Sequence, residues 1–147
     1  MAIHTGTYVS KDADFVIQSH VRQRILEDAL AELGFSRTGA QYFHPETPFF
    51  VEFPPGPLSI GDDLAIVPVE LSVRGVSALG LSATDSCRDR LAAFYHWNDR
   101  QALELAVAIA LRQRVDFDVI QRWSQAEGMA DQYVEFRRRV AATSSAD

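Results

Sequence analysis

Residues 10–17 read SKDADFVI, and this stretch decides how the first half of the chain is interpreted. The run from Ala13 to Ile17 is rich in β-branched and aromatic residues, which predicts a strand. Because side chains alternate across a strand, Asp12 and Asp14 would project from one face at its start, about 6–7 Å apart. Two ionised carboxylates this close repel each other unless a cation lies between them. The pattern indicates either a metal site or an acidic pair that simply ends the strand.

A third acid, Glu52, lies in residues 49–53, which read FFVEF and predict another strand. Phe50 and Glu52 would share one face of it. A carboxylate placed there either faces solvent or lies near a cation, and the sequence leaves both alternatives open. Mg²⁺ takes one or two carboxylates together with water and substrate phosphates. Asp12, Asp14 and Glu52 are therefore the candidate metal ligands.

Residues 1–81 alternate short apolar runs with glycine and proline, which indicates an α+β core. Apolar residues at helical spacing predict one helix over about 21–33, ended by Gly34. We expect a mixed sheet of four to six strands. Its expected strands are residues 13–17, 41–43, 49–53, 64–73 and 76–81, with a proline-rich break at 54–57.

Residues 82–147 predict a C-terminal helical bundle that forms one compact unit with the core. Ser82, Thr84 and Asp85 offer N-caps for a first helix, and Asn98 or Asp99 caps a second. A third helix is expected from about Asp116 to Gly128, and a fourth from about Asp131 to Val140.

The composition argues against nucleic-acid-coating, membrane-spanning and secreted proteins. The 147 residues hold 14 basic and 20 acidic side chains, a net charge of −6, which disfavours coating of nucleic acid but leaves local nucleotide contacts open. No apolar run approaches the 18 or so residues of a membrane span, and the N-terminal residues do not resemble a secretory signal. A single cysteine, Cys87, suits a reducing compartment. We therefore expect a cytoplasmic protein without a membrane segment.

Three segments resemble a known family. Residues 8–16, YVSKDADFV, resemble the R-x-[ST]-x-D-[IL]-D strand of the nucleotidyltransferase superfamily, which has the polymerase-β-like fold. Residues 81–94, LSATDSCRDRLAAF, and 96–103, HWNDRQAL, are similar to segments of its small bacterial group related to AbiEii-type toxin–antitoxin nucleotidyltransferases. The likeness extends from about residue 8 to residue 128, and its C-terminal segments are the more specific part.

The resemblance implies a role for each matching residue. Asp12 and Asp14 match the two metal-binding carboxylates, and Glu52 matches the third acid, which would activate an attacking hydroxyl. Asp99 resembles the acidic residue of the helical part. The resemblance also implies a nucleoside triphosphate substrate and Mg²⁺ as cofactor. Basic residues that would contact the phosphates are Lys11, Arg88 and Arg90, the two arginines lying where relatives have a lysine.

One departure from the family bears on activity. Relatives carry a Gly-Gly or Gly-Ser motif before the D-x-D strand, whereas Gly6 is the sole glycine before Asp12 here. Backbone N–H groups at such a motif hold phosphates. We therefore expect weak or absent nucleotide transfer, the alternative being a non-catalytic interaction protein or toxin–antitoxin component. We also expect a homodimer or a protein partner, since an uncovered sheet edge or apolar face recruits another chain.

Other reactive residues have structural explanations. The four histidines, His4, His20, His44 and His96, show no zinc-ligand spacing. We expect His96 to pack and hydrogen-bond at a helix end. Cys87 is expected to be a buried or idle thiol, and both Trp97 and Trp123 are expected to pack between helices.

Overall fold

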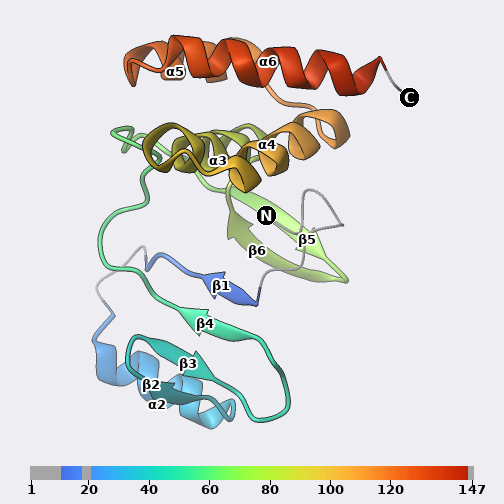
Figure 1. Cartoon of the computed structure of the whole chain (residues 1–147). Helices are drawn as coiled ribbons and strands as arrows, with labels where there is room; N and C mark the ends of the chain where they lie inside the picture. Colours follow the sequence, from blue (N-terminus) through green and yellow to red (C-terminus); the bar gives the residue numbers. More distant parts are fainter. Residues whose placement is uncertain (1–10, 18–20, 146–147) are drawn as a thin grey trace. The chain divides into compact units, whose positions relative to one another are not determined.

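The structure, a computed structural model, describes residues 11–17 and 21–145, and Figure 1 shows its helices and strands along the chain. Internal contacts divide it into two compact units, with the boundary between Leu58 and Ser59. Within the described residues, the first, here called the sheet unit, holds four strands and one helix, and the second, the helical unit, holds a β-hairpin and four helices. The fold is thus α+β with a helical C-terminal region, as the sequence predicts. None of the helices in the described ranges has the length and apolar character needed to cross a membrane.

The sheet unit is built on a mixed sheet in the order β1-β4-β3-β2. β1 pairs with β4 in parallel, whereas β4 with β3 and β3 with β2 are antiparallel. Its elements are β1 (Asp12–Asp14), α2 (Gln23–Glu32), β2 (Ser36–Thr38), β3 (Gln41–Phe43) and β4 (Phe50–Glu52).

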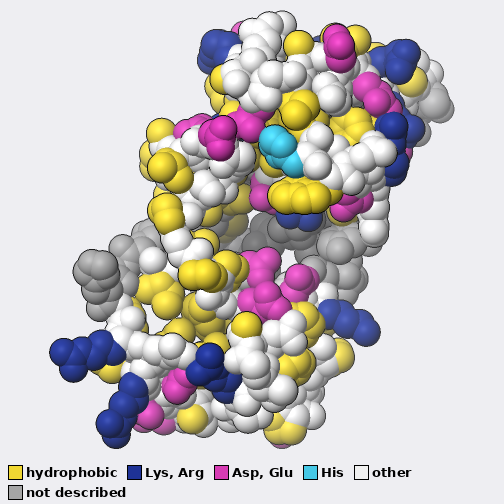
Figure 2. Space-filling model, turned by 60° about the vertical axis from the view of Figure 1, so that its left-hand side comes forward, with side chains coloured by type: hydrophobic (Ala, Val, Ile, Leu, Met, Phe, Trp, Pro, Cys, Tyr) yellow, Lys and Arg dark blue, Asp and Glu magenta, His cyan; other side chains and the backbone are white. Residues whose placement is uncertain are grey.

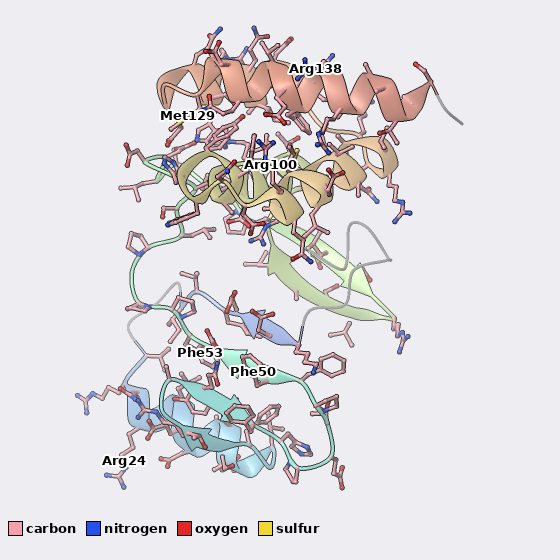
Figure 3. All side chains as sticks on the ribbon, in the orientation of Figure 1. Arg24, Phe50, Phe53, Arg100, Met129 and Arg138 are labelled. Atoms are coloured by element: carbon pink, nitrogen blue, oxygen red, sulfur yellow. The ribbon has the colours of Figure 1, made fainter. Side chains whose placement is uncertain are left out.

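One face of this sheet packs with α2. Arg37 of β2 donates to Glu27 of α2 at 2.8 Å, and Tyr42 of β3, in register with Arg37, is only 5% exposed. Phe53 follows β4 and packs edge-on against Tyr42, with ring centroids 5.7 Å apart, and stacks on Phe15 at 5.9 Å. Figure 3 labels Phe53 together with Phe50 of β4. The alternation expected for residues 49–53 is therefore present, and it leaves the opposite face to Phe50 and Glu52.

The helical unit has a continuous apolar core drawn from all of its helices. Its elements are β5 (Val69–Val73), β6 (Val76–Gly80), α3 (Ala83–Trp97), α4 (Arg100–Arg112), α5 (Phe117–Ala126) and α6 (Ala130–Ser144). Leu91, Leu103, Ile109, Ile120 and Phe136 are completely buried in it. Burial of such side chains is the main source of stability for a small domain.

Among the capping residues that the sequence offers, Ser82, Asp99 and Asp116 are the N-caps of α3, α4 and α5, whereas Asn98 is the C-cap of α3. Ser82 Oγ accepts the Asp85 N–H at 3.0 Å, and Asp99 Oδ1 accepts the Ala102 N–H at 3.0 Å. Asp116 accepts the N–H groups of Asp118 and Val119. Each oxygen satisfies a backbone donor that the first helical turn leaves without a partner.

Several sequence-based expectations were wrong. The strand expected over residues 64–73 is confined to β5, and β5 and β6 form a separate two-stranded sheet instead of joining the larger one. β2 was not predicted, because its sequence, Ser-Arg-Thr, lacks an apolar run. Trp97 is 77% exposed, so it does not pack between helices, whereas Trp123 is buried and stacks on Tyr95 at 5.5 Å, as expected.

A tight turn at Gly61 joins the start of the helical unit to the end of α5. Ile60 and Asp63 exchange two backbone hydrogen bonds of 3.0 and 3.1 Å, and Gly61 has a φ of +57°. The Glu127 side chain accepts the Asp62 N–H at 3.0 Å and lies directly against Gly61. A Cβ at position 61 would lie 2.5 Å from Glu127 Oε1, so glycine suits the positive φ of the turn and any larger residue would displace the Glu127 side chain.

Gly61→Ala should therefore destabilise the helical unit by about 3 kcal/mol, combining left-handed backbone strain with displacement of Glu127. Gly75→Ala is the matched control, because Gly75 also has a positive φ but has nothing within 4 Å of an added Cβ. It should cost only about 1 kcal/mol. Urea denaturation of both variants measures the difference, and equal losses would rule out the role given to the Glu127 contact.

Candidate functional site

The parallel pairing of β1 and β4 brings the predicted acidic residues onto one sheet face. Asp14 lies in register with Glu52, and Asp12 lies in register with Phe50. The Phe50 N–H donates to the Lys11 carbonyl at 2.8 Å, which begins the ladder. Neighbouring strands lie about 4.8 Å apart, so the side chains of Asp14 and Glu52 are adjacent. We call the face that carries Asp12, Asp14 and Glu52 the acidic face.

Burial differs among the three acids. Asp12 and Asp14 are exposed, and Glu52 is half-buried. In the space-filling view, acidic side chains gather in a patch over the sheet unit (Figure 2). A carboxylate pair exposed in this way is accessible to a cation from solvent.

Within residues 11–17 and 21–145, no three His, Cys, Asp or Glu side chains converge closely enough to hold a metal ion. The acidic face therefore offers adjacent carboxylates and not a closed cage. That donor set still fits Mg²⁺, which commonly uses one or two carboxylates and completes its shell with water and phosphate oxygens.

Glu52 has a second neighbour on the acidic face. Gln41 of β3 is in register with Glu52. Its amide Nε2 donates to Glu52 Oε1 at 2.5 Å. The row across β1, β4 and β3 thus reads Asp14, Glu52, Gln41. Gln41 was not among the residues singled out from the sequence, because only the register between β3 and β4 places it beside Glu52.

Lys11 immediately precedes β1 and is exposed. It lies one residue before Asp12, so among the predicted phosphate contacts it is the one on the same unit as the acidic face. A flexible lysine there supplies a point charge without a fixed direction.

Arg88 is buried within the helical unit, with 5% of the residue exposed. Its Nη2 donates to Asp63, and its Nη1 donates to Asp85 at 2.9 Å. The guanidinium also lies over the Trp123 ring, 5.1 Å from the centroid. Both terminal nitrogens therefore have carboxylate partners, and the charge is neutralised inside the unit.

The remaining predicted site residues also have structural contacts. Arg90 donates through Nη2 to Asp89 at 2.5 Å. Asp99 caps α4 through its Oδ1, as described above. The structure puts Asp12, Asp14 and Glu52 on one sheet face of the sheet unit, although they do not converge as a trio. Arg88, Arg90 and Asp99 belong to the helical unit.

A hollow of about 430 Å³ opens beside Arg88 in the helical unit. Its lining includes Asp63, Trp123 and Glu127, which come from the Gly61 turn and from α5 and its end. The sequence did not suggest this cluster, because its members lie up to 65 residues apart, as in the bond from the Asp62 N–H to Glu127.

His96 and Cys87 have the structural roles expected of them, and His44 packs against an aromatic ring. His96 at the end of α3 hydrogen-bonds to Glu127 Oε2 at 3.2 Å. His44 packs against Phe35, with ring centroids 5.1 Å apart. Cys87 is fully buried, and this burial raises the pKa of its thiol to about 12, so it is protonated at neutral pH and inert. His4, His20 and Gly6 lie outside the described residues.

Comparison with protein-family models, with curated proteins and with solved structures found no match to this chain. The resemblance to nucleotidyltransferases therefore rests on the three sequence segments alone, and the activity that it implies is a proposal.

The Asp63–Arg88 contact predicts how the stability of the folded protein changes at acid pH. The hydrogen bond from Arg88, helped by one from the Ala65 N–H, lowers the pKa of Asp63 below its ordinary value of 3.8. The stabilisation is therefore fully present above pH 3.8 and is lost as the pH falls through the lowered pKa. Asp63→Asn should be less stable than the parent at pH 7, and the difference should shrink below pH 3.8.

Chemical denaturation of both proteins across this pH range measures the difference. Asp62→Asn, which changes the adjacent carboxylate in the same turn, is the control and should stay parallel to the parent. A constant difference between the parent and Asp63→Asn would contradict the assignment.

Proposed function

We propose that this protein is a nucleotidyltransferase-like protein that binds a divalent cation on its acidic face and transfers nucleotide slowly. The observation that carries the proposal is the register of two parallel strands, which puts Asp14 beside Glu52 with Asp12 on the same face. It supports a cation site because like charges held side by side favour a divalent ion between them.

Each acid has a distinct role in this proposal. Asp12 and Asp14 would hold Mg²⁺, and Glu52, beside Asp14, would accept the proton of the attacking hydroxyl. Mg²⁺ supplies neutralisation of the negative charge on the triphosphate and its leaving group. Lys11 would add a positive charge beside the phosphates.

We expect the transfer to be slow because Arg88 and Arg90, two of the predicted phosphate contacts, are already paired with carboxylates. Phosphoryl transfer depends on positioning and charge stabilisation, and misplacement by about 1 Å costs a hundredfold in rate. Both terminal nitrogens of Arg88 have carboxylate partners, and Arg90 is paired with Asp89. Neither arginine can grip a triphosphate with its full charge unless it leaves these partners.

An interaction protein with the same fold is the second candidate. Helix α2 contributes no buried residue, and it exposes 59% of Ile25, with Leu33 just beyond its end 68% exposed. Exposed apolar side chains on a helix favour a protein partner or a second copy of the chain. The experiments below separate this candidate from an enzyme.

Mn²⁺ or Mg²⁺ should raise the melting temperature of the protein, because a ligand that binds only the folded state stabilises it. The gain is about 2.7 kcal/mol when the metal is 100 times above its Kd. Asp14→Asn should abolish the shift, whereas Asp28→Asn, on the exposed surface of α2, should keep it. Thermal scans with and without millimolar Mn²⁺ measure this, and a parent protein without any shift would contradict the cation site.

Nucleotide transfer should be detectable but slow. The full chain is incubated with each labelled triphosphate, Mg²⁺ and a pool of RNA or protein, beside the Asp12→Asn variant. We expect weak labelling of the acceptor that disappears in Asp12→Asn. Equal labelling by both proteins would contradict a catalytic role for Asp12 and would favour the second candidate, an interaction protein.

A further inference from the structure

We propose that the hollow beside Arg88 binds a free α-amino acid with an apolar side chain. This site is independent of the acidic face, because every residue that lines the hollow belongs to the helical unit. Its volume of about 430 Å³ lies in the range of about 300–1,000 Å³ that is common for small-molecule sites. Its walls combine buried N–H groups that lack an acceptor, two unpaired charges of opposite sign and an apolar surface.

Two buried side chains in the wall of the hollow have an N–H group without an acceptor. Arg88 and Trp123 are only 5% and 6% exposed, and both line the hollow. Within the described residues, neither Arg88 Nε nor Trp123 Nε1 has a hydrogen-bond partner. Folded proteins satisfy nearly all of their buried polar groups, so these donors indicate an acceptor that the chain itself does not supply. A small shift of the lining side chains would bring an oxygen of a bound carboxylate within reach of them.

The charged groups around the hollow leave one positive and one negative charge without a partner. Asp63 pairs with Arg88, and the Glu127 carboxylate accepts the Asp62 N–H. Arg122 and the Asp62 carboxylate are exposed at the hollow, and neither makes a hydrogen bond or an ion pair within the part of the chain that the structure describes. A zwitterion satisfies both groups, because its carboxylate pairs with the guanidinium and its ammonium pairs with Asp62. Charge-assisted hydrogen bonds of this kind are about twice as strong as neutral ones.

Helix α5 supplies the apolar part of the hollow. Val119, Trp123 and Ala126 lie three or four residues apart, so they share the face of α5 that lines the hollow. Val119 is half-buried and Ala126 is exposed, so both retain apolar surface that a ligand can cover. The side chain of the amino acid would lie against these two residues and remove apolar area from water.

The surroundings of Trp123 argue against a nucleotide in the hollow. Tyr95 stacks on the indole ring with centroids 5.5 Å apart, and the Arg88 guanidinium lies over the ring, 5.1 Å from its centroid. Sites for nucleic-acid bases generally stack the base on a free aromatic face. Because protein groups already occupy the ring, the hollow offers a ligand charged groups and aliphatic surface instead.

The test measures by calorimetry the binding of L-leucine and L-phenylalanine to the full chain. N-acetyl-leucine, which has no ammonium group, and leucinamide, which has no carboxylate, are the comparison ligands. Arg122→Gln and Asp62→Asn each remove one charge, and both side chains are exposed, so these variants should fold. Arg114→Gln is the matched control, because Arg114 is an exposed arginine that does not line the hollow. Ala126→Phe, also at an exposed position, fills the hollow and removes no charge.

We expect the parent to bind L-leucine about tenfold more tightly than either comparison ligand, since each lacks a hydrogen bond to a charged group. Arg122→Gln should lose the preference for L-leucine over leucinamide, and Asp62→Asn should lose the preference over N-acetyl-leucine. Arg114→Gln should keep both preferences, and Ala126→Phe should not bind.

Two results would overturn the proposal. If N-acetyl-leucine binds the parent as tightly as L-leucine, the ligand is a simple carboxylic acid and not an amino acid. If neither L-leucine nor L-phenylalanine binds at millimolar concentration, the hollow is not an amino-acid site. Melting temperatures of all variants without ligand show whether a loss of binding reflects a loss of folding.

Discussion

The parallel pairing of β1 with β4 is the constraint on which the acidic face depends. Two short strands from distant parts of the sheet unit exchange backbone hydrogen bonds, and their register sets Asp14 beside Glu52. The backbone bonds hold Asp14 and Glu52 side by side, and the aromatic packing of Phe15, Phe53 and Tyr42 stabilises the pairing from the opposite face of the sheet.

In the helical unit the charged side chains of Arg88 and Glu127 are enclosed by their neighbours. Arg88 is buried and neutralised by Asp63 and Asp85, and its guanidinium lies over Trp123. Glu127 is likewise enclosed, with the Asp62 N–H and His96 as its partners. These groups join the Gly61 turn to α3 and α5, so their polar contacts have a structural role. On the acidic face, by contrast, Asp12 and Asp14 are exposed to solvent.

Local chemistry explains why so much of the secondary structure could be predicted. A hydroxyl or carboxylate before an apolar helical pattern caps the helix wherever it occurs, so Ser82, Asp99 and Asp116 marked three helix starts correctly. The strands of the sheet were harder to predict from the sequence. β2 is short and polar, and its strand conformation comes from pairing with β3 rather than from its own residues. Trp97 and Trp123 have similar helical surroundings in the sequence, yet only Trp123 meets a partner helix.

The sequence by itself determined the α+β class, the approximate positions of the helices, and the alternation that puts Phe50 and Glu52 on one face. Tertiary structure alone decided which residues lie beside Glu52. A slip of two residues between β3 and β4 would keep every face assignment but set Phe43 opposite Glu52 in place of Gln41. Alternation has a period of two and cannot distinguish these registers. The choice is made by packing across strands, where the buried Tyr42 and the ladder of backbone bonds admit one of them.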